Sequence, residues 1–164
     1  MHKYYIIFSI ANNFFIYGII FEIFFFIKFI PFSIELINVY AQNKNINIIA
    51  VSKTVVMENI LPLIKYGHQH FGENKVQEAE KKWSNSKPIF PDVKLHMLGK
   101  LQSNKAEQAT ILFDYIHSLD NKKLAHKISK IQNELDTKTK LFVQVNVGNE
   151  NQKSGVAIDN LLNF

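Results

Sequence analysis

The sequence contains no cysteine, which excludes disulfide bonds, thiolate metal sites and cysteine nucleophiles. It also lacks a Walker loop, a GxGxxG pattern and a GxSxG pattern, so nucleotide binding through such loops and serine hydrolase chemistry have no support. A chain without disulfides fits a cytoplasmic domain, and we predict a cytoplasmic location.

Charged residues are scarce in residues 1–40, which hold most of the phenylalanines, whereas residues 41–164 are polar and rich in lysine. We therefore divide the chain into an apolar N-terminal segment, 1–40, and a globular region, 41–164. The formal net charge is +5, but the lysines are scattered along predicted helices and form no blocks. We interpret them as solvated faces and predict no nucleic acid partner.

The N-terminal segment contains an uncharged run, residues 4–21, that is long enough for a membrane-spanning helix within residues 4–30. Asn12, Asn13 and Glu22 oppose a membrane helix, because polar groups are costly in a bilayer. A signal peptide is disfavoured, since no small-residue cleavage site follows the run. A membrane anchor and a segment without selected structure ahead of a degraded gene stay open as interpretations.

The globular region opens on Ile48–Val51, a run of apolar residues typical of a strand that is buried in a parallel sheet. Ser52, Lys53 and Thr54 follow this strand directly. Ligands of parallel α/β sheets bind at the carboxyl ends of the strands. Lys53 is therefore a candidate for amine chemistry, and a solvated loop lysine is the alternative.

The rest of the globular region alternates predicted strands and helices, which indicates right-handed β–α–β units and a parallel sheet. The fold class is α/β. Periodicity does not decide between an open doubly wound sheet and part of a barrel. The further predicted strands are Gln69–Phe71, Val93–Met97, Tyr115–Leu119 and Leu141–Val147, the last with alternate residues on one face.

Helix boundaries are predicted from residues with capping chemistry. Asn59 is expected to cap the first helix of the globular region, and Gly67 to end it. Asn104 and Asp120 are expected to cap later helices. Glu73 is expected at a helix N-terminus, where a carboxylate is favoured.

Two histidines form a candidate pair of metal ligands. His68 and His70 would project two imidazoles to one face of a strand, but no third ligand is evident. His96 is interpreted as a packed residue. We predict no metal site.

Four short motifs follow one another over residues 48–156. They are Ala50-Val51-Ser52-Lys53-Thr54, Phe71-Gly72-Glu73-Asn74-x-x-Gln77-Glu78, His96-x-x-Gly99-x-Leu101-Gln102-x-Asn104-Lys105 and Asn146-x-x-x-Glu150-x-x-Lys153-Ser154-Gly155. In order and spacing they resemble the pyridoxal phosphate homeostasis protein family. That resemblance implies a (β/α)8 TIM-type barrel similar to the N-terminal domain of alanine racemase. About five of its parallel strands are expected here.

By this resemblance, Lys53 holds pyridoxal 5′-phosphate as a Schiff base at the end of the first barrel strand. Asn74 is expected beside the cofactor, and we infer that Lys153 is a second amine near the barrel mouth, with a loop lysine as the alternative. An amine must be unprotonated to attack an aldehyde, and burial at a strand end favours that state. The resemblance implies a carrier that controls free cofactor without established catalysis, with cofactor-dependent apo-enzymes as partners.

The sequence departs from the family pattern in two respects. Val55 and Val56 stand where the family usually has a lysine, commonly followed by proline, so a transfer role for that lysine is in doubt. The chain also stops after the fifth predicted strand, whereas a whole barrel takes about 250 residues and commonly binds phosphate after strands seven and eight. We therefore expect a truncated member with unpaired strand edges, and a member that has lost its function stays open as an interpretation. A cooperative monomeric melt with stoichiometric cofactor uptake would contradict that expectation.

Two other functions stay open at this stage. One is a fragment of a racemase or decarboxylase that uses the same cofactor, which would need a second domain and a catalytic tyrosine that this chain lacks. The other is a membrane-anchored remnant that binds no ligand.

Overall fold

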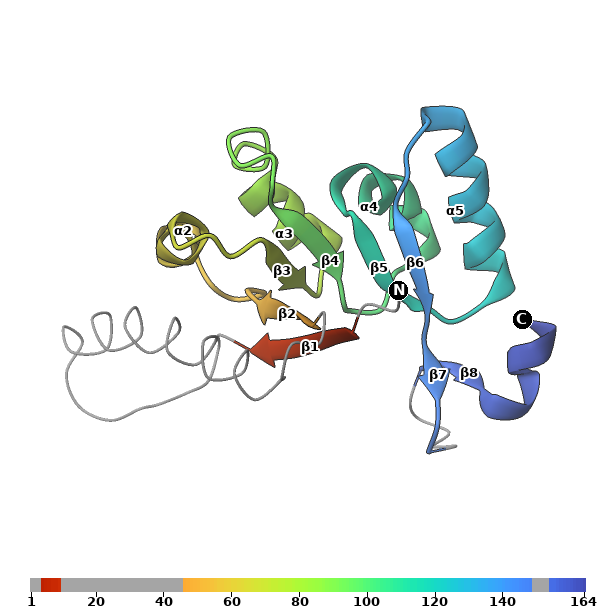
Figure 1. The fold of residues 1–164 in the computed structure, drawn as a ribbon. Coiled ribbons are helices and arrows are strands. Elements are labelled where there is room, and N and C mark those ends of the chain that lie inside the picture. The colour runs from red at the N-terminus through yellow and green to blue at the C-terminus, as the bar shows by residue number, and fades with distance from the viewer. Residues whose placement is uncertain (1–3, 10–45, 149–153) are drawn as a thin grey trace.

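A parallel sheet organises the computed structural model, which describes residues 4–9, 46–148 and 154–164. Its six strands lie side by side in the order in which they occur along the chain (Figure 1). They are β1 (Tyr4–Ser9), β2 (Ile46–Val51), β3 (His70–Glu73), β4 (Lys94–Met97), β5 (Tyr115–Leu119) and β6 (Lys140–Val143). β2 to β5 confirm the first four predicted strands within two residues at each end.

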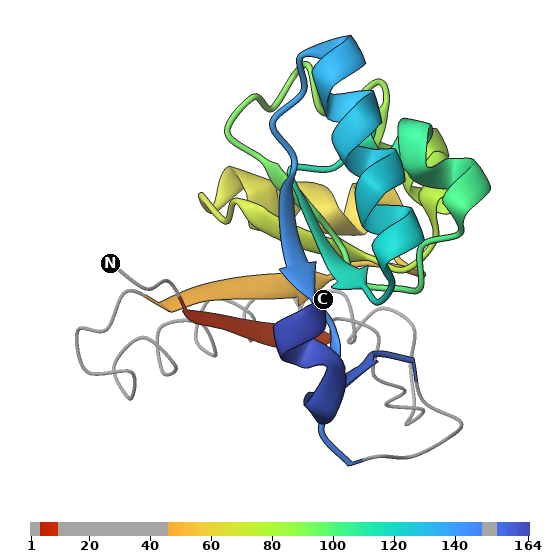
Figure 2. The ribbon, with the colours of Figure 1, turned by 90° about the vertical axis from the view of Figure 1, so that its right-hand side faces the viewer.

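Helices connect the strands and cover one face of the sheet (Figure 2). They are α2 (Met57–Lys65), α3 (Val76–Trp83), the short 3-10 helix η1 (Ser103–Lys105), α4 (Ala106–Leu112) and α5 (Lys122–Leu135). After β6, a small parallel pair of strands, β7 (Val145–Asn146) and β8 (Val156–Ala157), leads to a second 3-10 helix, η2 (Ile158–Asn163).

Strand order settles the question that periodicity left open. A doubly wound sheet reverses direction at a switch point and carries helices on both faces. Here the strands of the six-stranded sheet pair with their neighbours along the chain in parallel, and the described helices between β2 and β6 stay on one face, as in a segment of a barrel. The predicted α/β class and partial barrel are confirmed.

The strand β1 lies in the segment for which a membrane helix was considered. It pairs in parallel with β2 from Tyr4 opposite Ile46 to Ser9 opposite Val51, so a helix beginning at residue 4 is wrong. Residues 10–30 of that prediction lie outside the described residues. Among the helices of the described ranges, none combines the length and the apolar character needed to cross a membrane.

The hydrophobic core fills the space between the sheet and the helices. Trp83 of α3 is fully buried, and its ring lies 5.3 Å from that of Phe71 on β3. The apolar spacing within α3 therefore packs against the sheet, as helical periodicity requires. Other fully buried members of the same cluster include Ile60, Leu95, Ile116, Leu124 and Ile128.

α2 begins before its predicted cap, and α4 begins later than its predicted cap implies. α2 begins at Met57 after an extended Val56, so Asn59 lies inside the helix and caps nothing. Asn104 lies within η1, and α4 begins only at Ala106 without a side-chain cap. Gly67 does end α2 as predicted, with a positive φ of 100° that glycine adopts without strain.

The cap of α5 is displaced by one residue from its predicted position. Asn121 has extended backbone angles, φ −154° and ψ 150°, and its Oδ1 accepts a hydrogen bond from the Leu124 N–H at 2.8 Å. Asp120 instead accepts a hydrogen bond from the Asn121 side chain. Backbone geometry decides between two neighbours that have the same capping chemistry.

The fifth predicted strand, Leu141–Val147, is divided in two. Gln144 stands at the break, where its N–H donates to the Leu119 carbonyl at 2.8 Å and its carbonyl accepts from the Val156 N–H at 2.8 Å. The chain therefore leaves the main sheet and pairs with β8. The prediction of one continuous strand over Leu141–Val147 is wrong, and Val147, beyond the end of β7, is 74% exposed.

Candidate functional site

The turn that carries Lys53 begins at the carboxyl end of β2, a strand that is paired on both sides. The Ser52 N–H donates to the Gly72 carbonyl on β3 at 2.8 Å, and the Ser52 carbonyl accepts from the Val55 N–H at 3.0 Å. The Lys53 side chain is half-buried. Lys53 thus lies where the sequence placed it, at a strand end, while its chemical role stays a prediction.

Glu73, the last residue of β3, is fully buried. One of its carboxylate oxygens accepts hydrogen bonds from the turn after β2 and from α3. Its Oε1 accepts hydrogen bonds from Ser52 Oγ at 2.7 Å, Lys82 Nζ at 2.9 Å and Trp83 Nε1 at 3.0 Å. Its Oε2 is buried without a hydrogen-bond partner among the described residues. The expected place at a helix N-terminus is wrong, because α3 begins at Val76 and Glu73 points into the layer between sheet and helix.

Asn74 follows Glu73 and lines a cavity of about 370 Å³ at the carboxyl ends of β3 and β4. Lys75, Lys100 and Lys105 also line this cavity. Three lysines around one cavity favour an anionic ligand. Lys53 does not contribute to the lining.

Two glycines of the motifs allow the loops to approach one another closely. A Cβ atom on Gly99 would lie 2.1 Å from the carbonyl oxygen of Asn74, and one on Gly72 would lie 2.5 Å from Leu98 Cδ1. No larger residue fits at either position without moving its neighbour. Sequence reasoning missed this role, although an isolated glycine in or beside a strand signals close backbone approach.

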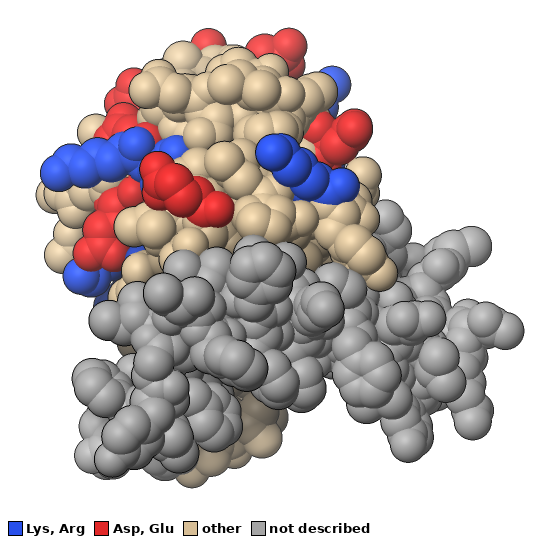
Figure 3. All heavy atoms as spheres, turned by 90° about the vertical axis from the view of Figure 1, so that its left-hand side faces the viewer, with Lys and Arg blue, Asp and Glu red and all other residues tan. Residues whose placement is uncertain are grey.

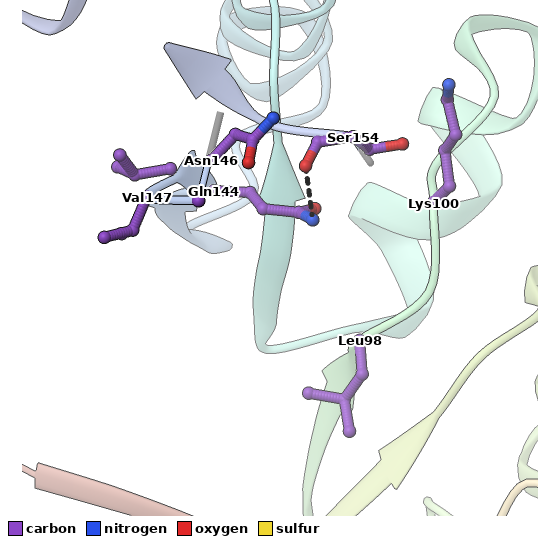
Figure 4. Close-up of a pocket in the computed structure, with 8 residues that line it drawn as sticks. Leu98, Lys100, Gln144, Asn146, Val147 and Ser154 are labelled. Atoms are coloured by element: carbon purple, nitrogen blue, oxygen red, sulfur yellow. Dashed lines mark hydrogen bonds between the residues drawn. The ribbon is translucent and has the colours of Figure 1, made fainter. Parts of the chain in front are cut away.

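A second cavity, of about 430 Å³, lies between the loop after β4 and the segment after β6 (Figure 4). Lys100 lines it from one side, and Gln144, Asn146 and Ser154 line it from the other. The Gln144 Nε2 donates to the Ser154 carbonyl at 3.2 Å, which joins two parts of that wall. Lys153 lies outside the described residues, so its predicted place near the barrel mouth stays a prediction.

Three histidines form a row across β3, β4 and β5. His70 Nδ1 lies 2.9 Å from His96 Nε2, and His96 Nδ1 lies 2.9 Å from His117 Nε2. Leu95 and Met97 belong to the core beneath the helices, so His96 between them faces the other side of the sheet.

The expected projection of His68 and His70 from one face of a strand is wrong, because β3 begins only at His70. His68 Nε2 donates to the backbone carbonyl of His70, whereas the His70 ring contacts His96. Over the described parts of the chain, no three His, Cys, Asp or Glu side chains are arranged to hold a metal ion.

Burial keeps two histidines of the row, His96 and His117, neutral. Burial, with smaller contributions from the neighbouring His117 and His70, lowers the pKa of His96 to about 2, and burial lowers the pKa of His117 to about 4. A neutral imidazole donates at one nitrogen and accepts at the other, as a continuous row requires. The His96 ring also stacks on the Tyr115 ring, with 4.4 Å between the ring centroids, which confirms the interpretation of His96 as a packed residue.

Surface charges are mixed on the side of the molecule where α2 lies in Figure 1. Figure 3 shows lysines interspersed with acidic side chains on that side. Exposed ion pairs such as Lys75 with Glu78 at 2.7 Å and Lys130 with Glu134 at 3.7 Å have the same character. These lysines form the solvated faces that their scatter along the sequence predicted.

Comparison with known proteins identifies similar chains, although no family model matches this sequence. The pyridoxal phosphate homeostasis protein of Vibrio alginolyticus is 34% identical over 115 residues, which are 69% of this chain and 49% of that protein. The protein of the same name from Aquifex aeolicus is 38% identical over 114 residues, 70% of this chain and 49% of that protein. The chain thus spans about half the length of the curated relatives it matches.

Solved structures give the same picture. PipY of Synechococcus elongatus is similar both without pyridoxal phosphate, with a TM-score of 0.67 and 40% identity, and with it bound, with a TM-score of 0.65 and 39% identity. Each match covers 74% of this chain and 56% of PipY. A protein from Bifidobacterium adolescentis is 24% identical and has a TM-score of 0.74. The match covers 94% of this chain and 66% of that protein, which shows a common fold.

Proposed function

The chain is related to the pyridoxal phosphate homeostasis proteins over about half of their length, and on that premise we propose that it binds pyridoxal 5′-phosphate and serves in the intracellular control of this cofactor. The relatives bear the name of homeostasis proteins and not of enzymes. We accordingly propose a cytoplasmic carrier without catalysis of its own, which delivers the cofactor to dependent apo-enzymes.

The residues at the strand ends fit the chemistry of this cofactor. Lys53 offers an amine at the carboxyl end of β2, and its half-burial on a constrained turn is the observation that carries the proposal. The cavity beside Asn74, at about 370 Å³, falls in the size range of small-molecule sites, and its lysines suit a phosphate group.

Each residue then has a separate task. When bound, pyridoxal phosphate would supply an aldehyde that can condense with an unprotonated amine of the chain and release one water molecule. We assign the covalent attachment to the Nζ of Lys53. We place Asn74 beside the cofactor and assign Lys153 as a second amine near the mouth. Lys100 and Lys105 line the cavity, and their positive charges would attract a phosphate group into it.

Chemical trapping tests this proposal. The chain is mixed with pyridoxal phosphate and reduced with borohydride, and the modified residue is mapped by mass spectrometry. We expect one label per chain on Lys53, and loss of both the visible absorption band and the label in Lys53→Ala. Lys65→Ala, at an exposed position in the last turn of α2, is the control and should keep both. A band that survives unchanged in Lys53→Ala, or a label on another residue, contradicts the proposal.

A further inference from the structure

Ser52, the residue directly before Lys53, is held at every polar atom that it has. Its N–H donates to the Gly72 carbonyl at 2.8 Å, and its Oγ donates to Glu73 Oε1 at 2.7 Å. Its carbonyl accepts from the Nζ of Lys82 as well as from the N–H of the turn. The backbone that leads into Lys53 is therefore fixed by groups from β3 and α3.

The buried ion pair of Glu73 and Lys82 is the centre of this arrangement. Their side chains are 0% and 12% exposed, and Lys82 Nζ lies 2.9 Å from Glu73 Oε1. Hydrogen bonds between ionised groups are stronger and more directional than neutral ones, and burial protects them from screening. Trp83 Nε1 holds the same Oε1 at 3.0 Å, so two successive residues of α3 determine where the carboxylate lies.

We propose that Glu73 and Lys82 are positioning residues for Lys53, acting through Ser52 to set where the amine of Lys53 lies. The inference rests on the proposed function, because it assigns a use to the fixed turn only if Lys53 is the attachment residue. A preorganised turn holds the attacking nitrogen in place before the aldehyde arrives, and displacements of about 1 Å slow such attacks by up to about a hundredfold.

The chain contains a matched control for this pair. Lys87 Nζ also bridges a backbone carbonyl and a carboxylate, at 2.7 Å from the Leu112 oxygen and 2.9 Å from Asp114 Oδ2. Asp114 directly precedes β5, so this second bridge lies at the amino ends of the strands, whereas Lys53 lies at a carboxyl end. Removing either lysine breaks a bridge between a backbone carbonyl and a carboxylate, but only the bridge of Lys82 holds Ser52.

The test compares Lys82→Met, Lys82→Arg and Lys87→Met in the full chain. The first readout is the rate of borohydride-trapped attachment of pyridoxal phosphate to Lys53. The second is amide hydrogen exchange in residues 52–55 without cofactor. We expect Lys82→Met to slow attachment about tenfold or more and to speed exchange in residues 52–55. Lys82→Arg, which keeps the charge and the donors, should restore both, and Lys87→Met should lower only the unfolding temperature.

Equal slowing in Lys82→Met and Lys87→Met, or unchanged exchange in Lys82→Met, overturns the inference. If Lys82→Met does not fold, Ser52→Ala replaces it, since that variant keeps the ion pair and removes one hydroxyl donor. It should slow attachment and speed exchange in the same residues, and wild-type values overturn the inference. Wild-type protein that attaches no cofactor at Lys53 refutes the proposed function, and the exchange measurement then decides alone whether the pair holds the turn.

Discussion

The row of histidines shows how burial of single residues makes stability depend on pH. The unfolded chain takes up protons on its histidines as the pH falls below about 6.5. Folded His117 takes up its proton only near pH 4 and folded His96 near pH 2. The unfolded state therefore binds more protons than the folded state over this interval. The contribution of these neutral side chains is complete above pH 6.5 and is lost as the pH falls.

Urea unfolding between pH 7 and pH 4.5 measures this effect. Each of the two histidines should add up to about 1.4 kcal/mol per pH unit to the loss of unfolding free energy below pH 6.5. His117→Gln should reduce the slope, because one proton-binding difference disappears. His126→Gln, at an exposed position on α5, serves as the control and should keep the wild-type slope. Identical slopes in all three proteins would show that the row does not control acid stability.

Gly99 is a second residue whose effect can be measured by one substitution. In Gly99→Ala, the new Cβ would lie 2.1 Å from the Asn74 carbonyl oxygen, so the backbone beside the cavity must move. We expect a loss of about 1–3 kcal/mol in unfolding free energy and weaker attachment of pyridoxal phosphate.

Gly67→Ala is the comparison for this substitution. Its Cβ would meet nothing within 4 Å, but its φ of 100° is unfavourable for alanine, so stability should fall by about 1–2 kcal/mol. Attachment of the cofactor should be unaffected. Wild-type attachment in Gly99→Ala would mean that the close approach to Asn74 does not shape the site.

Among the elements, α5 tests whether a capping residue has been assigned correctly. Asn121→Ala removes the acceptor of the Leu124 N–H and should cost about 1 kcal/mol of stability. Asp120→Ala should cost less, because Asp120 contacts only the Asn121 side chain in this cap. Urea midpoints of the two variants decide between them. A larger loss in Asp120→Ala would return the cap to the residue that the sequence suggested.

The break between β6 and β7 arises from hydrogen bonds to residues that are distant along the chain. Local alternation of apolar residues predicts one strand from Leu141 to Val147, and that pattern is present. Hydrogen bonds of Gln144 to Leu119 on one side and to Val156 on the other nevertheless divide it. Partners at these distances along the chain leave no signal in a window of seven residues.

At the scale of the molecule, the described residues form a cluster of buried apolar side chains that runs from Ala50 to Ile131 between the sheet and α2, α3, α4 and α5. Trp83, the one tryptophan of the sequence, lies inside it with 0% exposure. Its fluorescence therefore reports on the core, whereas circular dichroism reports on all helices. Packing of all these helices on one cluster favours cooperative unfolding.

We expect the two signals to change together during urea unfolding of the wild-type chain. In Trp83→Phe, circular dichroism should show an unfolding free energy lowered by about 1–3 kcal/mol, because the Glu73 hydrogen bond and part of the ring are lost. Phe113→Leu, which truncates another buried ring of the cluster that makes no such hydrogen bond, serves as the comparison. Separate fluorescence and dichroism transitions would contradict a single core.

The sequence alone determined the features that depend on neighbours along the chain. These are the alternation of strands and helices, the place of Lys53 after a buried strand, and the motifs that resemble those of the pyridoxal phosphate homeostasis proteins. Residues that lie next to one another carry that information, because propensity and periodicity act over a few positions.

Only the tertiary structure decided the strand order, the addition of β1 to the sheet, and the contacts of Glu73 with Ser52 and Lys82. It also joined His70, His96 and His117 into one row. Each of these features brings together groups that are distant in the sequence, and burial strengthens the contacts between those groups. The local sequence indicates whether a side chain is charged, polar or apolar, but the fold determines which group that side chain contacts.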